Sequence, residues 1–237
     1  MNAKLIAAYI FGSVARGEQD RLSDLDVLAV VRTGGGKIDD SEVENLVPPA
    51  LLGFKLSISW YGQDRLREMF ENGELFAWHL AQETTPIFDP TNFIENLGRP
   101  ATYRDAAKDV ASFFRVFSGI REQVSASPHN AAYEAGLIYV CIRNAAMAAS
   151  ARLCPAPDFS RYSAFKLQDV APCPISTAQF DSAMRSRMAS QRGYPPPPEA
   201  TAGFVLHLLD QLEPWLQTLQ MVVEEKCGGR LVASNSL

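Results

Sequence analysis

The residues best suited to chemistry lie close together near the start of the chain, as Gly12-Ser13 followed by Asp24 and Asp26. Gly12 lets the backbone come close to a phosphate, and Ser13 can donate its hydroxyl and amide at the same turn. Asp24 and Asp26 are two apart in an apolar run. Because side chains alternate between the faces of a strand, both carboxylates project to one side. The pattern predicts a phosphate-binding turn beside a carboxylate pair.

The carboxylate pair predicts a metal ion. Two carboxylates on one face repel each other unless a cation lies between them, and Mg²⁺ accepts one or two carboxylates together with phosphate oxygens and water. In nucleotidyl transfer a protein mainly positions the attacking oxygen in line with the α-phosphate while metal ions neutralise the developing charge. The expected cofactors are Mg²⁺ and a nucleoside triphosphate, with ATP as the first candidate. Each motif alone is more simply a turn or a solvent-facing strand start, but together they favour catalysis.

The composition limits the other function classes. With 47% hydrophobic and 21% charged residues the chain is typical of globular proteins. Its net charge of −5 argues against broad nucleic-acid binding, which needs a surface excess of Lys and Arg. The scattered cysteines and histidines argue against a zinc site. The N-terminal segment does not resemble a signal peptide, and no apolar run reaches the roughly 18 residues of a membrane span. We expect a cytoplasmic protein with no membrane partner.

The elements that must position the motifs are predicted by periodicity. Apolar runs predict four strands, at 5–11, 24–31, 54–61 and 85–88. Apolar residues at helical spacing predict a helix over 63–81, with Gly73 as an interruption. The first half is therefore a mixed αβ domain, in which Gly12-Ser13 follows the first strand and the aspartates begin the second.

Beyond about Pro100 the periodicity is helical throughout. Apolar residues recur at three and four positions from Tyr103 to Ile120, which predicts an amphipathic helix. Residues 130–152 are apolar nearly all round, which predicts the central helix of a bundle. Further helices are expected at 176–190 and 200–226. The predicted fold class is α+β, with a mixed-sheet αβ domain at 1–98 and an all-α helical bundle at 101–237.

A Gly-Ser pair, ten intervening residues and Asp-x-Asp together resemble the signature of the polymerase-β-like nucleotidyltransferase superfamily. The fuller string Ala15-Arg16-Gly17 is most similar to the minimal nucleotidyltransferase branch, which includes antitoxin-type proteins and aminoglycoside-modifying enzymes. The resemblance implies that the Gly-Ser turn contacts the nucleotide phosphates and that the two aspartates bind metal. Arg16 is a candidate for steadying a phosphate, and the alternative is a solvated surface arginine.

One departure from the family pattern concerns the third carboxylate, which a neighbouring strand usually supplies. The corresponding run, 54–61, has Ser57 or Ser59 where an aspartate is expected. A serine can hold a metal-bound water but cannot act as a general base near neutral pH. The departure leaves open a catalytically impaired site.

The helical half resembles the HEPN-type domain that accompanies many nucleotidyltransferases. Its ribonuclease members carry an arginine followed four to six residues later by histidine, and no histidine follows Arg143 at that spacing. We therefore do not predict RNA cleavage. In fused antibiotic-modifying relatives, acidic residues of the helical domain face the nucleotide.

Two residues outside the motif are further candidates. Glu134 lies in the apolar 130–152 segment and is the candidate catalytic residue of the helical half, as a ligand of the acceptor or as a base. Its alternative is an ion pair or hydrogen bond within the bundle, with Arg143 as the candidate partner. His79 is expected to be a satisfied core histidine, with a place near the nucleotide base as the alternative.

These patterns predict an enzyme that moves a nucleoside monophosphate from a Mg-nucleotide to a hydroxyl of a small molecule or protein. The alternative is a non-catalytic nucleotide-binding sensor or an antitoxin-like module that docks on a partner protein. The acceptor, the preferred base and a homodimeric state are left open by the sequence.

Overall fold

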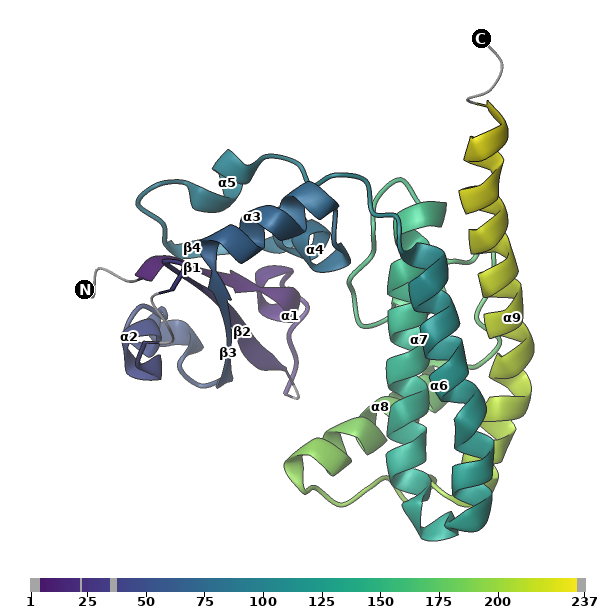
Figure 1. Cartoon of the computed structure of the whole chain (residues 1–237). Helices are drawn as coiled ribbons and strands as arrows, with labels where there is room; N and C mark the ends of the chain where they lie inside the picture. The colour runs from purple at the N-terminus through teal and green to yellow at the C-terminus, as the bar shows by residue number, and fades with distance from the viewer. Residues whose placement is uncertain (1–4, 22, 35–37, 234–237) are drawn as a thin grey trace. The chain divides into compact units, whose positions relative to one another are not determined.

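The computed structural model of the chain describes residues 5–21, 23–34 and 38–233, with side chains as far as residue 226. The chain divides into two compact units, Met1–Arg104 and Asp105–Leu237. Figure 1 labels their elements.

The first unit is built on a four-stranded mixed sheet with the strand order β3-β2-β1-β4. The strands are β1 (Leu5–Phe11), β2 (Asp24–Val31), β3 (Lys55–Gly62) and β4 (Thr85–Phe88). β1 pairs antiparallel with β2 and with β4, whereas β3 pairs parallel with β2. A parallel pair needs a crossover connection, and here it passes through α2 (Asp40–Glu44). The four predicted strands are confirmed, with β3 displaced by one residue.

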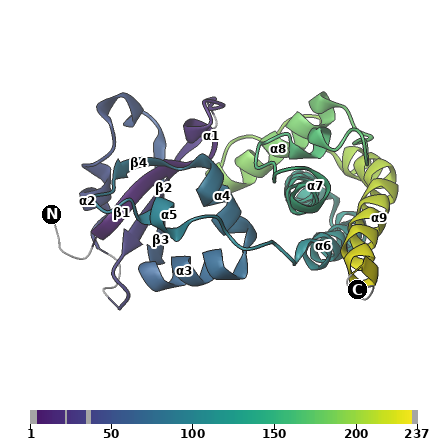
Figure 2. The ribbon, with the colours of Figure 1, turned by 90° about the horizontal axis from the view of Figure 1, so that it is seen from above.

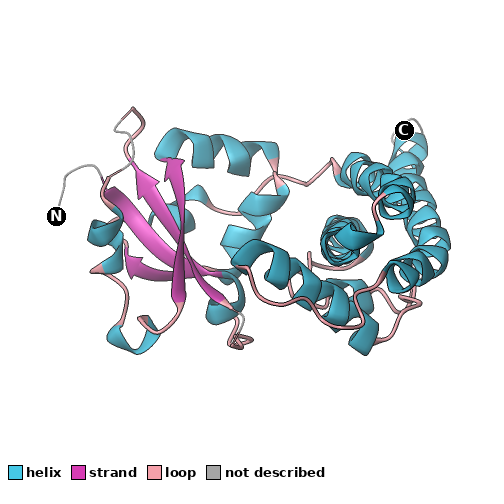
Figure 3. Cartoon of the chain, turned by 90° about the horizontal axis from the view of Figure 1, so that it is seen from below, coloured by secondary structure: helices cyan, strands magenta, loops and turns pink. Residues whose placement is uncertain are grey.

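Helices cover both faces of this sheet (Figure 3). One face buries Tyr9, Phe11 and Leu28 against α3 (Gln63–Asn72), α4 (Leu75–Glu83) and α5 (Phe93–Leu97). The other face buries Leu25 and Val27 with the α2 region. The helix predicted at 63–81 is two helices, because Gly73 adopts the left-handed conformation at φ 66° that ends a helix.

The segment that ends the first unit is bonded to the junction of α3 and α4. The amide of Ala101 donates to the carbonyl of Phe70 at 2.8 Å, and the indole Nε1 of Trp78 donates to the carbonyl of Ala101 at 2.9 Å. Gly73 leaves room for this segment, because a Cβ there would collide with the backbone of Ala101. Residues up to Ala101 are therefore part of the packed first unit.

The second unit is helical in all its described secondary structure. Its long helices are α6 (Ala106–Ala126), α7 (Ala131–Leu153), α8 (Thr177–Arg192) and α9 (Ala202–Ala233). α7 is buried along most of its length and contacts the other three, as the view along its axis in Figure 2 shows. Gly136 permits the close approach of α8, since a Cβ there would lie 2.8 Å from the backbone of Arg187. The predicted central helix and the α+β class are confirmed.

No helix in the described part of the chain is long and apolar enough to cross a membrane.

Candidate active site

The Gly-Ser turn follows β1 directly. Gly12 begins the short helix α1 (Gly12–Ala15) with φ at 73°, a conformation that favours glycine. It is buried, and a Cβ at this position would lie 2.8 Å from Oδ2 of Asp26. Glycine is therefore required here both by the backbone conformation and by the neighbouring carboxylate. The side chain of Asp26, the second aspartate of the motif, therefore lies directly against the backbone of the Gly-Ser turn.

The two aspartates share a face of β2. Asp24 and Asp26 are half-buried, whereas Leu25 between them is 1% exposed and packs in the core on the opposite face. Asp26 is opposite Phe11 in the antiparallel β1–β2 ladder, next to the start of the Gly-Ser turn. The sequence-based placement of both carboxylates on one side of the strand agrees with this burial pattern.

The register of β2 with β3 shows which residues of the neighbouring strand lie beside the aspartates. Asp24 is paired with Lys55, Asp26 with Ser57, and Leu28 with Ser59. Residues paired in this way share a face of the sheet. Ser57 therefore lies beside Asp26, at the position where a third carboxylate would join the two aspartates. Ser59 lies two residues farther along β3.

Lys55 is a neighbour of the site that the sequence analysis missed. It is exposed at the start of β3 and shares the face of Asp24. The alternation Lys55-x-Ser57-x-Ser59 is visible in the sequence, but the register that places it beside the aspartates is not. An ammonium group at this position lowers the repulsion between nearby carboxylates and phosphates.

The acidic residues of the motif are the metal-binding groups that this site offers. Among the described residues, no group of three or more His, Cys, Asp or Glu side chains is placed to hold one. Asp24 and Asp26 provide two carboxylates beside a turn that a phosphate could approach. Mg²⁺ commonly takes one or two protein carboxylates and completes its coordination with phosphate oxygens and water. The residues present fit such an ion.

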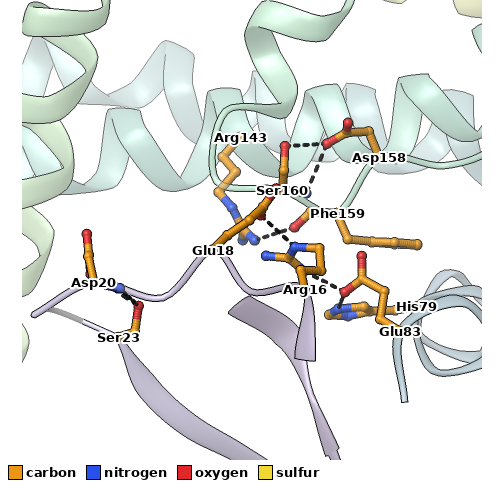
Figure 4. Close-up of polar contacts among 10 residues, drawn as sticks. All are labelled: Arg16, Glu18, Asp20, Ser23, His79, Glu83, Arg143, Asp158, Phe159 and Ser160. Carbon is orange, nitrogen blue, oxygen red and sulfur yellow. Dashed lines mark hydrogen bonds and ion pairs between the residues drawn. The ribbon is translucent and has the colours of Figure 1, made fainter. Parts of the chain in front are cut away.

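Arg16, at the C-terminal end of α1, is held by two carboxylates (Figure 4). Its Nε donates to Glu18 at 2.7 Å and its Nη1 to Glu83 of α4 at 2.5 Å. Its side chain is 17% exposed, so the alternative of a solvated surface arginine is wrong. Burial alone would lower the pKa of Arg16, but the hydrogen bond to Glu18 and the charge of Glu83 outweigh it and raise that pKa above its usual value.

His79 is bonded to the same carboxylate. Its Nε2 lies 2.7 Å from Oε2 of Glu83 (Figure 4). Its ring packs edge-on against Phe11, with 5.5 Å between the ring centroids. The prediction of a satisfied core histidine is confirmed. Glu83, 9% exposed, joins α4 to the turn through Arg16 and was missed by the sequence analysis. The spacing of His79 and Glu83, four residues apart on a helix, was the available signal.

Glu134 lies on α7 in the second unit and is 5% exposed. Its Oε2 has no hydrogen-bond partner among the described residues, and burial raises its pKa. Arg143 donates instead to the carbonyl of Phe159 at 3.2 Å (Figure 4), so the ion pair with Glu134 offered as an alternative is not formed. The catalytic role of Glu134 stays a prediction.

Comparisons with known proteins agree with the motif. Residues 2–76 match the family model of the nucleotidyltransferase domain. A comparison with curated protein sequences finds no match. The solved structure of a nucleotidyltransferase-like protein from Exiguobacterium sibiricum 255-15 is similar over 97% of this chain and 73% of that chain, with 13% identity and a TM-score of 0.41.

Proposed function

We propose that the first unit binds a Mg-nucleoside triphosphate, with ATP as the first candidate, and transfers its nucleoside monophosphate to a hydroxyl group. The observation that carries the proposal is the meeting of Gly12 with Asp26, which places a turn of the kind that binds phosphate against a carboxylate of the kind that binds metal. The match of residues 2–76 to the nucleotidyltransferase domain supports it.

In this proposal each residue of the turn has a distinct task. The hydroxyl and amide of Ser13 bind the triphosphate, because the first amides of a helix have no acceptor within it. Asp24 and Asp26 hold Mg²⁺, which when bound neutralises phosphate charge. Arg16 uses Nε and Nη1 to bind carboxylates, and we assign its Nη2 to a phosphate oxygen. Glu83 then acts as a positioning residue that fixes the guanidinium beside the turn.

The general base and the acceptor are assigned to the second unit. Ser57 cannot remove a proton from an acceptor hydroxyl near neutral pH. Glu134 is a carboxyl whose pKa is raised by burial, which brings it closer to the range suited to a base at neutral pH. We propose Glu134 as that base, within a HEPN-like helical unit that binds a hydroxyl-bearing small molecule or protein.

The decisive experiment measures pyrophosphate release from each of the four common nucleoside triphosphates with Mg²⁺, using polyhydroxylated small molecules and purified proteins as acceptors. We expect release with at least one acceptor and its loss in Asp26→Asn. Ser13→Ala should weaken nucleotide binding by about 1–2 kcal/mol, the scale of a hydrogen bond to a charged group. No release under any condition would count against transfer, and unchanged nucleotide affinity in Ser13→Ala would refute the phosphate position.

A second candidate function is a non-catalytic nucleotide-binding sensor or an antitoxin-like module. The observation that favours it is Ser57, which occupies the position beside Asp26. Calorimetric nucleotide binding with no turnover would support this candidate. Transfer that is abolished by Asp26→Asn would exclude it.

A further inference from the structure

A pocket of about 490 Å³ lies in the first unit, at the end of the sheet opposite the Gly-Ser turn. Its walls come from the first residues of β1, the residue after β2, α3, and the β4–α5 connection with α5. β1 runs from Leu5 at the pocket to Phe11 at the turn, which separates the two places by roughly 20 Å. The pocket is therefore distinct from the candidate active site.

Part of the lining of this pocket is apolar. Leu5 and Phe93 are buried, and Ile6 and Leu97 are partly buried. The volume falls within the range of about 300–1,000 Å³ that is typical of small-molecule sites, which combine apolar walls with a few polar groups. The body of a small organic molecule could bury its surface here.

Among the described residues, the charged side chains that line the pocket are Arg32 and Arg67. Arg32 is exposed just after β2. Arg67 lies over the ring of Phe93, with its guanidinium carbon 5.6 Å from the ring centroid. Its Nη1 donates to Oδ1 of Asp64 at 2.8 Å, and Asp64 does not line the pocket. Guanidinium groups bind the paired oxygens of phosphates and carboxylates through parallel hydrogen bonds. The two arginines therefore place positive charge, part of it balanced by Asp64, at a pocket whose lining mixes apolar and polar side chains.

The start of α3 borders the pocket through Gln63, its first residue. The amide of Asp64 in this turn donates to Oγ1 of Thr33 at 3.2 Å, and the carboxylate of Asp64 lies in the same turn, where it offsets the partial positive charge of the helix end. The attraction of this pocket for an anion therefore depends on the two arginines.

We propose that this pocket binds a small organic anion, whose planar or apolar body packs on Leu5, Phe93 and Leu97 and whose phosphate or carboxylate binds Arg32 and Arg67. The proposal does not depend on nucleotidyl transfer. It assigns the first unit a second ligand site at the end of the sheet away from the aspartates.

The test uses three probes with one ring system, namely naphthyl phosphate, naphthoate and the uncharged naphthamide, titrated into the full chain without Mg²⁺. We expect at least one anion to bind about tenfold tighter than the amide, because charge-assisted hydrogen bonds to the guanidinium groups contribute on that scale. The stronger of the two anions identifies the group that the site prefers.

Arginine variants locate the binding. Arg32→Gln and Arg67→Gln should each weaken anion binding roughly tenfold. Arg65→Gln is the matched control, because Arg65 lies on the same helix with 45% exposure against 47% for Arg67 but does not line the pocket. Leu97→Asp, which places a negative charge at the pocket while keeping both arginines, should abolish binding of the anionic probes.

Several results would overturn the proposal. Equal affinity for the anions and naphthamide, or no binding of any probe, would exclude an anion site. Unchanged binding in Arg32→Gln would do the same, and this exposed residue decides the matter even if Arg67→Gln disturbs folding. Binding that is lost in Ser13→Ala but kept in Arg32→Gln would place the anion at the Gly-Ser turn instead.

Discussion

Asp26 fills the space into which a side chain at Gly12 would project, its Oδ2 lying 2.8 Å from the Cβ position. The contact explains why two pieces of the motif that are separated in sequence depend on each other. It also gives a way to measure that dependence, because a second glycine in the same turn has nearly the same backbone conformation.

Gly12→Ala should destabilise the protein by about 2–4 kcal/mol, the sum of a left-handed backbone penalty and overpacking against Asp26. Gly17→Ala is the control, since Gly17 has φ at 70° with open space around it and should cost only about 1–2 kcal/mol. Urea unfolding measures both. Equal losses in the two variants would mean that Asp26 does not restrict the turn.

Asp24→Asn and Asp26→Asn should each weaken Mg²⁺-dependent nucleotide binding strongly while leaving the fold intact. Removing one of two neighbouring negative charges should leave the metal-free protein as stable, or more stable by about 1 kcal/mol. Calorimetric titration of ATP with and without Mg²⁺ measures the effect, with Asp169→Asn as an exposed control in the second unit. Wild-type affinity in both variants would remove the metal assignment.

Ser57→Asp should create a third metal ligand beside Asp26. Without metal the variant should melt at a lower temperature, because three carboxylates then repel one another, and Mg²⁺ should restore more stability than it gives the wild type. Ser59→Asp is the matched control, since Ser59 is paired with Leu28. A Mg²⁺-dependent rise in melting temperature that is as large in Ser59→Asp would show that the register does not determine the effect.

Glu83→Gln should destabilise the first unit by about 1–3 kcal/mol, because it leaves the largely buried guanidinium of Arg16 with one charged partner. Glu18→Gln should cost less than about 1 kcal/mol, since Glu18 is half-exposed. The double variant Arg16→Gln/Glu83→Gln should recover part of the loss. If the loss of stability in the double variant equals the sum of the losses in Arg16→Gln and Glu83→Gln alone, Arg16 and Glu83 are not coupled.

Glu134 should make stability depend on pH. Burial raises its pKa in the folded state, so its contribution to stability is fully present below the ordinary pKa of a glutamate and is lost as pH rises through the raised value. Glu134→Gln should therefore gain stability relative to the wild type as pH increases from about 4 to 8, with exposed Glu122→Gln as control. A stability difference that does not change with pH would show that Glu134 ionises as it does in the unfolded chain.

The strands and the motif were predictable from sequence because both depend on local patterns. Apolar runs fix where strands form, and the alternation of a strand places Asp24 and Asp26 on one face whatever the partner strand is. Lys55 and Glu83 were not predictable as neighbours of the motif. The first depends on the register of a parallel pair joined by a long crossover, and the second on how α4 packs against the turn.

The pocket at the end of the sheet opposite the Gly-Ser turn could not be predicted from the sequence, for a related reason. Its two arginines lie 35 positions apart, counting from Arg32 to Arg67, and neither belongs to a motif. Only the sheet order and the packing of α3 and α5 bring the segments that carry them together. Periodicity reports which face of an element is buried, but not which elements meet.

The bonds of Ala101 determine where the chain can be cut. A fragment that ends at Gly98, the last residue of the domain expected from the sequence, would leave the carbonyl of Phe70 and the indole of Trp78 without their partners and uncover the gap beside Gly73. A fragment that ends at Arg104 keeps all three contacts. The six residues after Gly98, of which the first two lie between the two domains expected from the sequence, are thus the closing segment of the N-terminal fragment.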